Sequence, residues 1–137
     1  MAVLILDSEA LSALARPHDD LTRHRAVRRQ VTVAEREGWR VCVPSAVLVE
    51  LYRGGGADQP IDRQLATGVP RVITTGRQIA RIAGHLLASI GAASDMAVDA
   101  LVVATARRLG GGLVMTHDPV DMRRLAANSP NVAISPI

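Results

Sequence analysis

Short apolar runs alternate with longer segments of helical character along the whole chain. Apolar runs predict strands at 2–6, 40–43 and 112–116, with weaker candidates at 71–74 and 132–134. Helical spacing and capping residues predict helices at 8–15, 21–37, 45–53, 61–67, 77–90, 94 or 95 to about 110, and 119–127. Because strands alternate with helices, the pattern predicts an α/β fold, a three-layer α/β/α sandwich with a mainly parallel central sheet.

Acidic residues stand where the predicted strands end. Asp7 directly follows the first apolar run, and Asp118 comes two residues after the fourth strand. Glu50 lies in the helix after the second strand, and Asp95 and Asp99 open the helix before the fourth. The carboxyl ends of parallel strands meet at one edge of a sheet, where open α/β folds bind ligands. We therefore expect these five carboxylates to converge at that edge.

A group of buried acids costs free energy unless a cation compensates it. Carboxylate oxygens suit hard divalent cations, so the pattern predicts a Mg²⁺ or Mn²⁺ site. Glu50 has apolar neighbours in sequence, and we expect it to be buried. For Asp7 and Asp95 two roles stay open, a metal ligand or the cap of the following helix. Asp121 is expected to face solvent, and His117 is either a catalytic base or a surface residue.

Size and composition narrow the class of protein. The 137 residues, 48% of them hydrophobic, predict one domain spanning 1–137. No apolar run approaches the roughly 18 residues of a membrane span, and no signal-peptide pattern precedes the first strand, so we expect a cytoplasmic protein. Cys42 is the only cysteine, which excludes an internal disulfide and a CxxC zinc site. Its apolar surroundings predict a buried thiol.

The charged residues favour a nucleic-acid partner, although weakly. All 16 basic residues are arginine, so the lysine of a P-loop is missing, and the formal charge is +3. Arginine suits bidentate phosphate contacts. Four arginines near motif ends are candidates for such contacts, with solvated helix ends as the alternative: Arg16, Arg53, Arg107 and Arg108. With no Phe, one Trp and one Tyr, base stacking has little support.

Four segments taken together resemble the PIN-domain family. They are LILDS at 4–8, PSAVLVELYRG at 44–54, VDALVVATA at 98–106 and LVMTHD at 113–118. Length and motif order look most like the VapC-type toxins of bacterial toxin–antitoxin pairs, and the resemblance covers essentially the whole chain. It implies that Asp7, Glu50, Asp99 and Asp118 match the family's acidic quartet, with Asp95 as an additional acid of some members.

The resemblance also implies an activity. Such proteins hydrolyse RNA phosphodiester bonds with Mg²⁺ or Mn²⁺. We assign Asp7 and Asp99 as principal metal ligands, with Glu50 and Asp118 completing the shell or orienting water, and Thr116 matches the family's hydroxyl position. Whether one or two metal ions bind stays open.

The partners that the resemblance implies are an RNA substrate, a cognate VapB-like antitoxin protein and a second copy in a homodimer, with no membrane. Apolar residues at 10–15 and 47–52 either line a groove for the antitoxin or belong to the core. Two alternatives remain for the function, a PIN-fold nuclease with a non-toxin role and a non-catalytic binding module.

Overall fold

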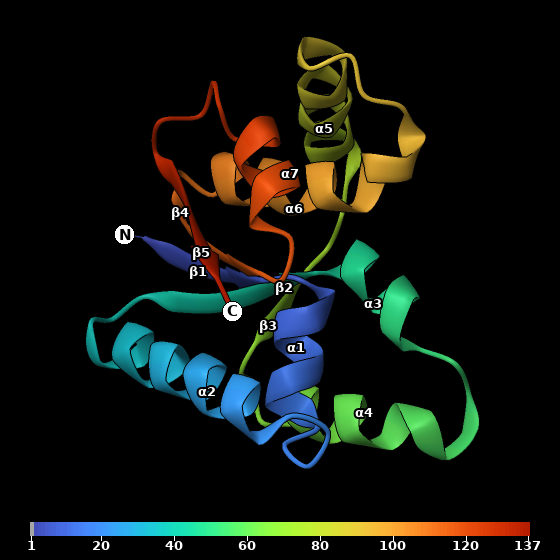
Figure 1. The fold of residues 1–137 in the computed structure, drawn as a ribbon, viewed down its shortest axis with the longest axis vertical. Helices are drawn as coiled ribbons and strands as arrows, with labels where there is room; N and C mark the ends of the chain where they lie inside the picture. The colour runs from blue at the N-terminus through green and yellow to red at the C-terminus, as the bar shows by residue number, and fades with distance from the viewer. Residues whose placement is uncertain (1) are drawn as a thin grey trace.

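A parallel sheet forms the centre of the computed structural model, which describes residues 2–137 (Figure 1). Within that range the sheet has five strands in the order β3-β2-β1-β4-β5, and every neighbouring pair is parallel. The strands are β1 (Val3–Leu6), β2 (Arg40–Pro44), β3 (Arg71–Ile73), β4 (Gly112–Thr116) and β5 (Val132–Pro136). The predicted sheet is confirmed, including its two weaker strands.

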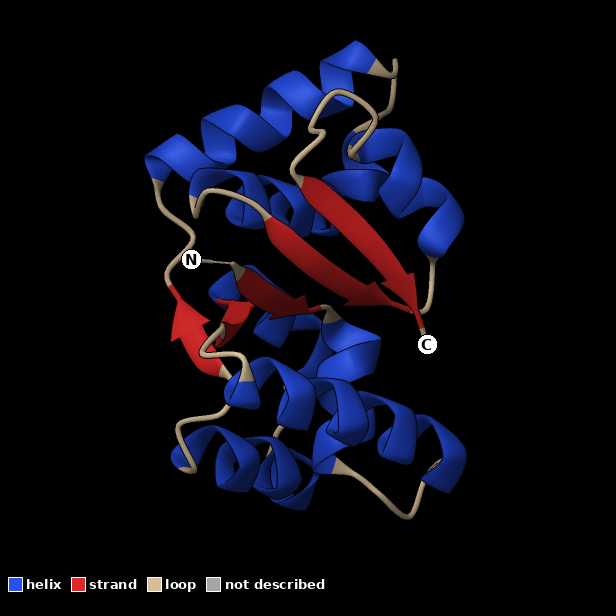
Figure 2. Cartoon of the chain, turned by 90° about the vertical axis from the view of Figure 1, so that its left-hand side faces the viewer, coloured by secondary structure: helices blue, strands red, loops and turns tan. Residues whose placement is uncertain are grey.

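Helices cover both faces of this sheet. They are α1 (Ser8–Ala15), α2 (Leu21–Arg36), α3 (Ser45–Leu51), α4 (Gln59–Ala66), α5 (Arg77–Ser89), α6 (Ala97–Arg108) and α7 (Pro119–Leu125), with the 3₁₀ turns η1 (Gly55–Asp58) and η2 (Ser94–Met96). Helices α1, α2 and α4 lie on one side of the strands and α5, α6 and α7 on the other (Figures 1 and 2). The predicted three-layer sandwich is confirmed. Across residues 2–137, no helix has the length and apolar character to cross a membrane.

The central strand β1 explains why the first apolar run is continuous. All four of its side chains are 0% exposed, because helices pack on both faces of the sheet. A strand buried on both sides has no polar face and loses the alternation of a half-exposed strand. Cys42, on the neighbouring β2, is free and also fully buried, as predicted. Packing in the core therefore fixes β1 up to Leu6, the residue before Asp7.

Helices α3 and α6 begin without a side-chain cap. Pro44, and not Ser45, is the N-cap of α3, and the Ser45 hydroxyl instead accepts a hydrogen bond from the Thr75 backbone N–H at 2.9 Å. Asp95 does not cap α6, whose N-cap is Met96, because the 3₁₀ turn η2 intervenes. Helix α3 instead follows β2 directly, and α6 continues from η2.

In an open α/β sheet of this strand order, the ligand-binding crevice is expected at the carboxyl ends of β1 and β4. The chain leaves β1 for α1 and α2 on one face of the sheet, whereas it enters β4 from α6 and leaves it for α7 on the other face. The loops that follow β1 and β4 therefore diverge to opposite faces, the switch point at which open α/β sheets bind ligands. Leu6 pairs with Met115, so Asp7 emerges beside Thr116.

Candidate metal centre

Three carboxylates from two helices meet at this edge. One oxygen each of Asp99, Asp118 and Asp121 lies within 4.8 Å of the other two. Asp99 stands in the first turn of α6, Asp118 is the N-cap of α7, and Asp121 stands in the first turn of α7. Both helices point their N-termini at the same place, and the positive end of a helix dipole favours carboxylates there.

Asp7 lies at the base of the crevice and is almost fully buried. Its side chain is the N-cap of α1, and its Oδ1 accepts a hydrogen bond from the Ala10 backbone N–H at 2.8 Å. Only 6% of the residue is exposed, and this burial raises the pKa of the carboxyl. Hydrogen bonds from Thr116, Ala10 and the His117 backbone lower that pKa in part. The capping role predicted as one alternative is confirmed, and it leaves the second carboxylate oxygen outside the cap bond.

Thr116 connects the acids of the two strands. Its side chain is 0% exposed, and its hydroxyl hydrogen-bonds to the Asp7 carboxylate. The same oxygen accepts a hydrogen bond from the Asp118 backbone N–H at 2.9 Å. A buried hydroxyl that donates one hydrogen bond and accepts another is fixed in orientation. Thr116 therefore fixes Asp7 relative to the turn that carries Asp118.

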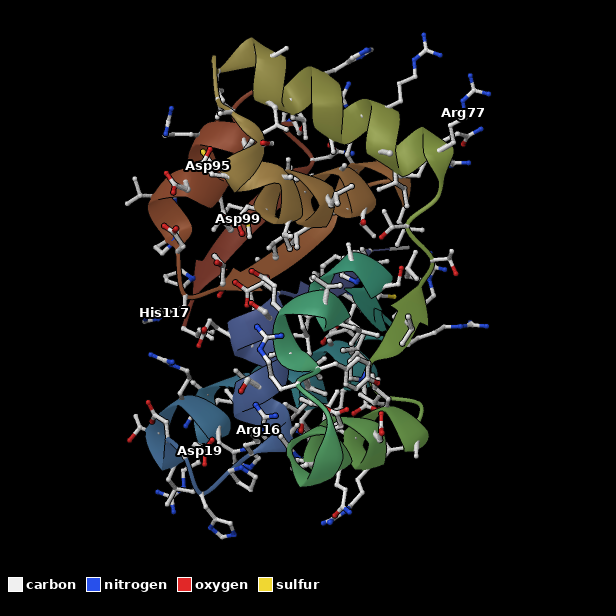
Figure 3. The ribbon with its side chains drawn as sticks, turned by 90° about the vertical axis from the view of Figure 1, so that its right-hand side faces the viewer. Arg16, Asp19, Arg77, Asp95, Asp99 and His117 are labelled. Carbon is white, nitrogen blue, oxygen red and sulfur yellow. The ribbon has the colours of Figure 1, made fainter. Side chains whose placement is uncertain are left out.

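Asp99 carries the clearest electrostatic sign of a shared site. Burial raises the pKa of its carboxyl to about 6, and the charges of four further acids contribute in the order Asp118, Asp7, Glu50 and Asp121. Like charges that crowd together disfavour ionisation of any one of them. Figure 3 shows Asp99 below Asp95 and above His117 on one side of the molecule. The crevice thus concentrates negative charge, and within residues 2–137 the one ion pair made by these acids is that of Asp121 with Arg124 at 3.4 Å.

Glu50 lies near this group, but it is exposed, so the prediction of a buried glutamate is wrong. Helix α3 buries only Val47 and Leu51, while Val49 is 74% exposed. The apolar neighbours of Glu50 in sequence are therefore poor guides to its surroundings. The carboxylate still lies close enough to raise the pKa of Asp99.

Two other acids differ from expectation in opposite directions. Asp95 is exposed on η2, and the close group of carboxylates within residues 2–137 does not include it. Asp121 was expected to face solvent, yet its side chain is only 35% exposed and belongs to that group. The spacing of Asp118 and Asp121 carried a signal for this, because residues three apart share one face of a helix.

His117 lies at the rim and is held by an arginine of α2. Its Nδ1 accepts a hydrogen bond from Arg23 at 3.1 Å, and the ring is exposed. Arg23 also forms ion pairs with Glu9 at 3.5 Å and with Asp20 at 3.8 Å. This arrangement matches the surface alternative for His117, since the bond to Arg23 occupies the nitrogen lone pair that a base would use.

The four candidate arginines fall into two separate places. Arg16 and Arg53 line a pocket of about 920 Å³ that Glu50 also lines. Arg107 and Arg108 occupy the last turn of α6, whereas Asp99 occupies the first turn. At a rise of about 1.5 Å per residue, Arg108 lies about 14 Å along the helix axis from Asp99. Arg16 and Arg53 therefore share a pocket with Glu50, whereas Arg107 and Arg108 lie at the far end of α6.

The residues at the crevice fit a hard divalent cation. Asp99, Asp118 and Asp121 offer oxygens at mutual distances that one ion can span, and Asp7 adds a buried carboxylate. All the donors are carboxylates, the ligand type of Mg²⁺ and Mn²⁺ and not of soft metals. A cation would also offset the repulsion that raises the pKa of Asp99.

Comparison with known proteins gives a family and a fold. The model of the PIN domain family matches residues 4–128. Comparison with curated proteins gave no match. Among solved structures, VapBC2 from Rickettsia felis bound to a DNA fragment from their promoter has a TM-score of 0.67 at 14% identity, over 98% of each chain. DNA-bound VapBC from Salmonella typhimurium has a TM-score of 0.65 at 16% identity, over 99% of this chain and 98% of that one.

Proposed function

The chain belongs to the PIN domain family, and on that premise we propose that it is a Mg²⁺- or Mn²⁺-dependent endoribonuclease. One observation carries the proposal, the convergence of Asp7, Asp99, Asp118 and Asp121 at the crevice beyond β1 and β4. Phosphodiester hydrolysis with a hard divalent cation is the chemistry that such a carboxylate group supports best.

In this proposal Asp7 and Asp99 are the principal ligands, and Asp118 and Asp121 complete the set. A bound divalent cation supplies Lewis-acid stabilisation of the charge that develops on the scissile phosphate and lowers the pKa of water. Thr116 acts as a positioning residue, because its hydroxyl holds Asp7 in place and fixes the Asp118 backbone. Glu50 faces solvent at the rim, where its carboxylate is suited to orienting an incoming water.

We further propose that the enzyme is the toxin of a toxin–antitoxin pair, a cytoplasmic homodimer whose PIN-like domain spans residues 1–137. Support comes from the fold shared with two VapBC complexes, which suggests a VapB-like antitoxin partner. Ala10, Leu11, Ala13 and Leu14 of α1 are buried, which favours the core alternative over the groove for this helix. Two exposed apolar side chains adjoin acids of the site in sequence, Val49 next to Glu50 at 74% exposed and Val120 between Asp118 and Asp121 at 67% exposed.

Two assays test the proposal. Purified protein is incubated with total RNA in Mg²⁺, Mn²⁺ or EDTA, and the cut ends are mapped; we expect cleavage with either metal and none in EDTA. Asp99→Asn should abolish cleavage, while Glu37→Gln, a charge-matched change at an exposed position, should not. Intact RNA in all conditions would contradict the nuclease and favour a binding module.

The toxin role needs a separate test in cells. Expression of the chain alone should arrest growth, and co-expression with the neighbouring gene product should relieve the arrest. Harmless expression of a protein that cuts RNA in vitro would favour a PIN nuclease with another role.

A further inference from the structure

A basic pocket lies directly beside the acidic crevice. It is bounded by the end of α1, the end of α3, η1 and α4, and it has a volume of about 920 Å³. Its charged lining includes the guanidinium groups of Arg16, Arg53 and Arg63 and the carboxylates of Asp19 and Glu50. Glu50 also raises the pKa of Asp99, so it connects the pocket to the acidic group. The two features are therefore neighbours on one surface.

The guanidinium groups of the three arginines in this basic pocket have neutral partners only. Arg16 donates to the Ala57 carbonyl at 2.8 Å, Arg53 to the Tyr52 carbonyl at 2.7 Å, and Arg63 to Gln59 Oε1 at 3.2 Å. In the range 2–137, no carboxylate oxygen lies within 4.0 Å of any of the three. Each guanidinium has five N–H donors, so each keeps donors for an anion. Their positive charge is not neutralised within the described chain.

Bonds to the backbone hold two of these guanidinium groups in place. Arg53 donates to the carbonyls of both Val49 and Tyr52, and Arg16 bridges from α1 to η1. An arginine that is already fixed loses less conformational entropy when it binds a ligand. The pocket is thus prepared for an anion with several oxygens, and arginine recognises phosphate with paired hydrogen bonds.

The length of α1 sets how far the pocket reaches from the crevice. Asp7 caps the start of α1 and Arg16 caps its end. At about 1.5 Å per residue, these two residues are about 13 Å apart along the helix axis. A ligand that spans both places must be an extended polyanion and not a single phosphate group.

We propose that this basic pocket is a subsite for backbone phosphates of the RNA strand that flank the scissile bond. The inference rests on the proposed nuclease function and adds the place where the strand continues beyond the acids. Arg53 and Arg63 contact the flanking phosphates, and Arg16 lies at the inner wall. Because the contacts go to phosphates, the subsite holds any sequence and orients the strand across the crevice.

The test compares two pairs of arginines. Arg53→Gln with Arg63→Gln removes two charges from the pocket, and Arg107→Gln with Arg108→Gln removes two charges at the far end of α6. Binding of a fluorescent single-stranded RNA 12-mer is measured in EDTA, where no cleavage occurs, over a series of salt concentrations. All four positions are exposed, and circular dichroism checks that each variant is folded.

We expect the pocket variant to bind the 12-mer at least about tenfold more weakly than the parent protein. The slope of log affinity against log salt should fall by about 1.4, since each lost phosphate contact on a single strand contributes about 0.7. The far-end variant should change affinity less than about twofold. Arg53→Lys with Arg63→Lys should restore the salt slope but not the full affinity, because lysine keeps the charge and loses the paired hydrogen bonds.

Cleavage gives a second readout that separates the subsite from the acids. In Mn²⁺ the pocket variant should lose more kcat/KM on the 12-mer than on a dinucleotide, which is too short to reach the pocket. An equal loss on both substrates would overturn the subsite. If the parent protein cuts neither substrate, the proposed nuclease fails, while the binding comparison in EDTA still decides the subsite.

Two binding results would overturn the proposal. One is RNA affinity and salt slope in the pocket variant that equal those of the parent protein. The other is an equal loss in the far-end variant, which would show a diffuse effect of net charge. A poly-glutamate peptide serves as a probe for an acidic protein segment. Loss of peptide binding with unchanged RNA binding would assign the pocket to a protein partner instead.

Discussion

Asp99→Asn should stabilise the metal-free protein at neutral pH, because it removes the carboxylate whose ionisation the fold opposes most clearly. The pKa of Asp99 is raised from 3.8 to about 6 by burial and by four neighbouring acids. The difference between folded and unfolded pKa values corresponds to at most about 3 kcal/mol at about 1.36 kcal/mol for each pKa unit. Asn has nearly the same shape and carries no charge, so this penalty disappears in the variant.

The measured stabilisation by Asp99→Asn should be smaller than this upper limit of about 3 kcal/mol for two reasons. The side chain is only partly buried, and solvent screening weakens the repulsion. The charge also gains about 0.3–1 kcal/mol from the N-terminus of α6, which the variant loses. A net stabilisation of about 1–2 kcal/mol remains, equivalent to a rise in Tm of about 3–8 °C for a chain of this length.

The sign of the pH dependence follows from the raised pKa. Between about pH 4 and pH 6 the folded wild type binds more protons at Asp99 than the unfolded chain does, so its free energy of unfolding falls as pH rises. This contribution to stability is fully present below pH 3.8 and is lost as pH rises through about 6. The advantage of Asp99→Asn should therefore be largest at pH 7–8 and shrink toward zero near pH 4.

Urea unfolding in EDTA at five pH values from 4 to 8 measures this effect, with Glu37→Gln as a charge-matched control at an exposed position. The control should follow the wild-type curve. The reasoning is refuted if Asp99→Asn is less stable than wild type at pH 8. It is also refuted if its advantage is the same at pH 4 as at pH 8.

Three further substitutions test the fold around the site by urea unfolding. Gly112→Ala should cost at least about 3 kcal/mol, because a Cβ atom there would lie 2.1 Å from the Val3 carbonyl oxygen and force β1 and β4 apart; a near-neutral result would show that the two strands are not so close. Gly84→Ala, where the Cβ meets nothing within 4 Å in α5, should instead gain about 0.5–1 kcal/mol. Tyr52→Phe should lose about 0.5–1.5 kcal/mol with the 2.6 Å hydrogen bond to Asp62. The same bond raises the pKa of Tyr52, the only tyrosine, to about 12; absorbance titration should show this value, and Asp62→Asn should bring it back toward 10.

The position of the crevice could be predicted from the sequence, because it depends on where the strands end. Apolar runs mark β1 and β4 clearly, and parallel strands bring the residues after them to one edge. Asp7 and Asp118 were therefore placed correctly at that edge by pattern alone. Asp99 followed because a helix that is apolar after its first turn must enter the core beside the sheet.

Short helices and turns were harder to predict. Helix α3 has seven residues and two buried side chains, too few for the hydrophobic pattern to fix which face Glu50 occupies. Asp95 was placed with Asp99 on one helical face, but η2 is a 3₁₀ turn and changes the direction of its side chain. Asp121 lies three residues after Asp118, a spacing that places both on one face of a helix. From the sequence, Asp121 was expected to face solvent, although this spacing indicated that it lies near Asp118.

The sequence named Arg16 and Arg53 as candidates for phosphate contacts, but it did not predict that they share a pocket with Arg63. Arg16, Arg53 and Arg63 come from the end of α1, the segment after α3, and α4, and no periodicity relates them. Their neighbourhood depends on how η1 folds back toward α1, where Arg16 binds the Ala57 carbonyl. Such loop-to-helix packing is a tertiary property that a local pattern does not encode.

Calorimetric titration of the protein with Mn²⁺ tests most directly whether the converging acids form a metal centre. At pH 7.5 the wild type and Glu37→Gln should show saturable binding, and Asp99→Asn should bind at least about tenfold more weakly. At pH 5 wild-type binding should weaken, because Asp99 is then mostly protonated and Mn²⁺ must displace the proton. Absence of binding by the wild type, or equal binding by Asp99→Asn, would contradict a metal centre at this crevice.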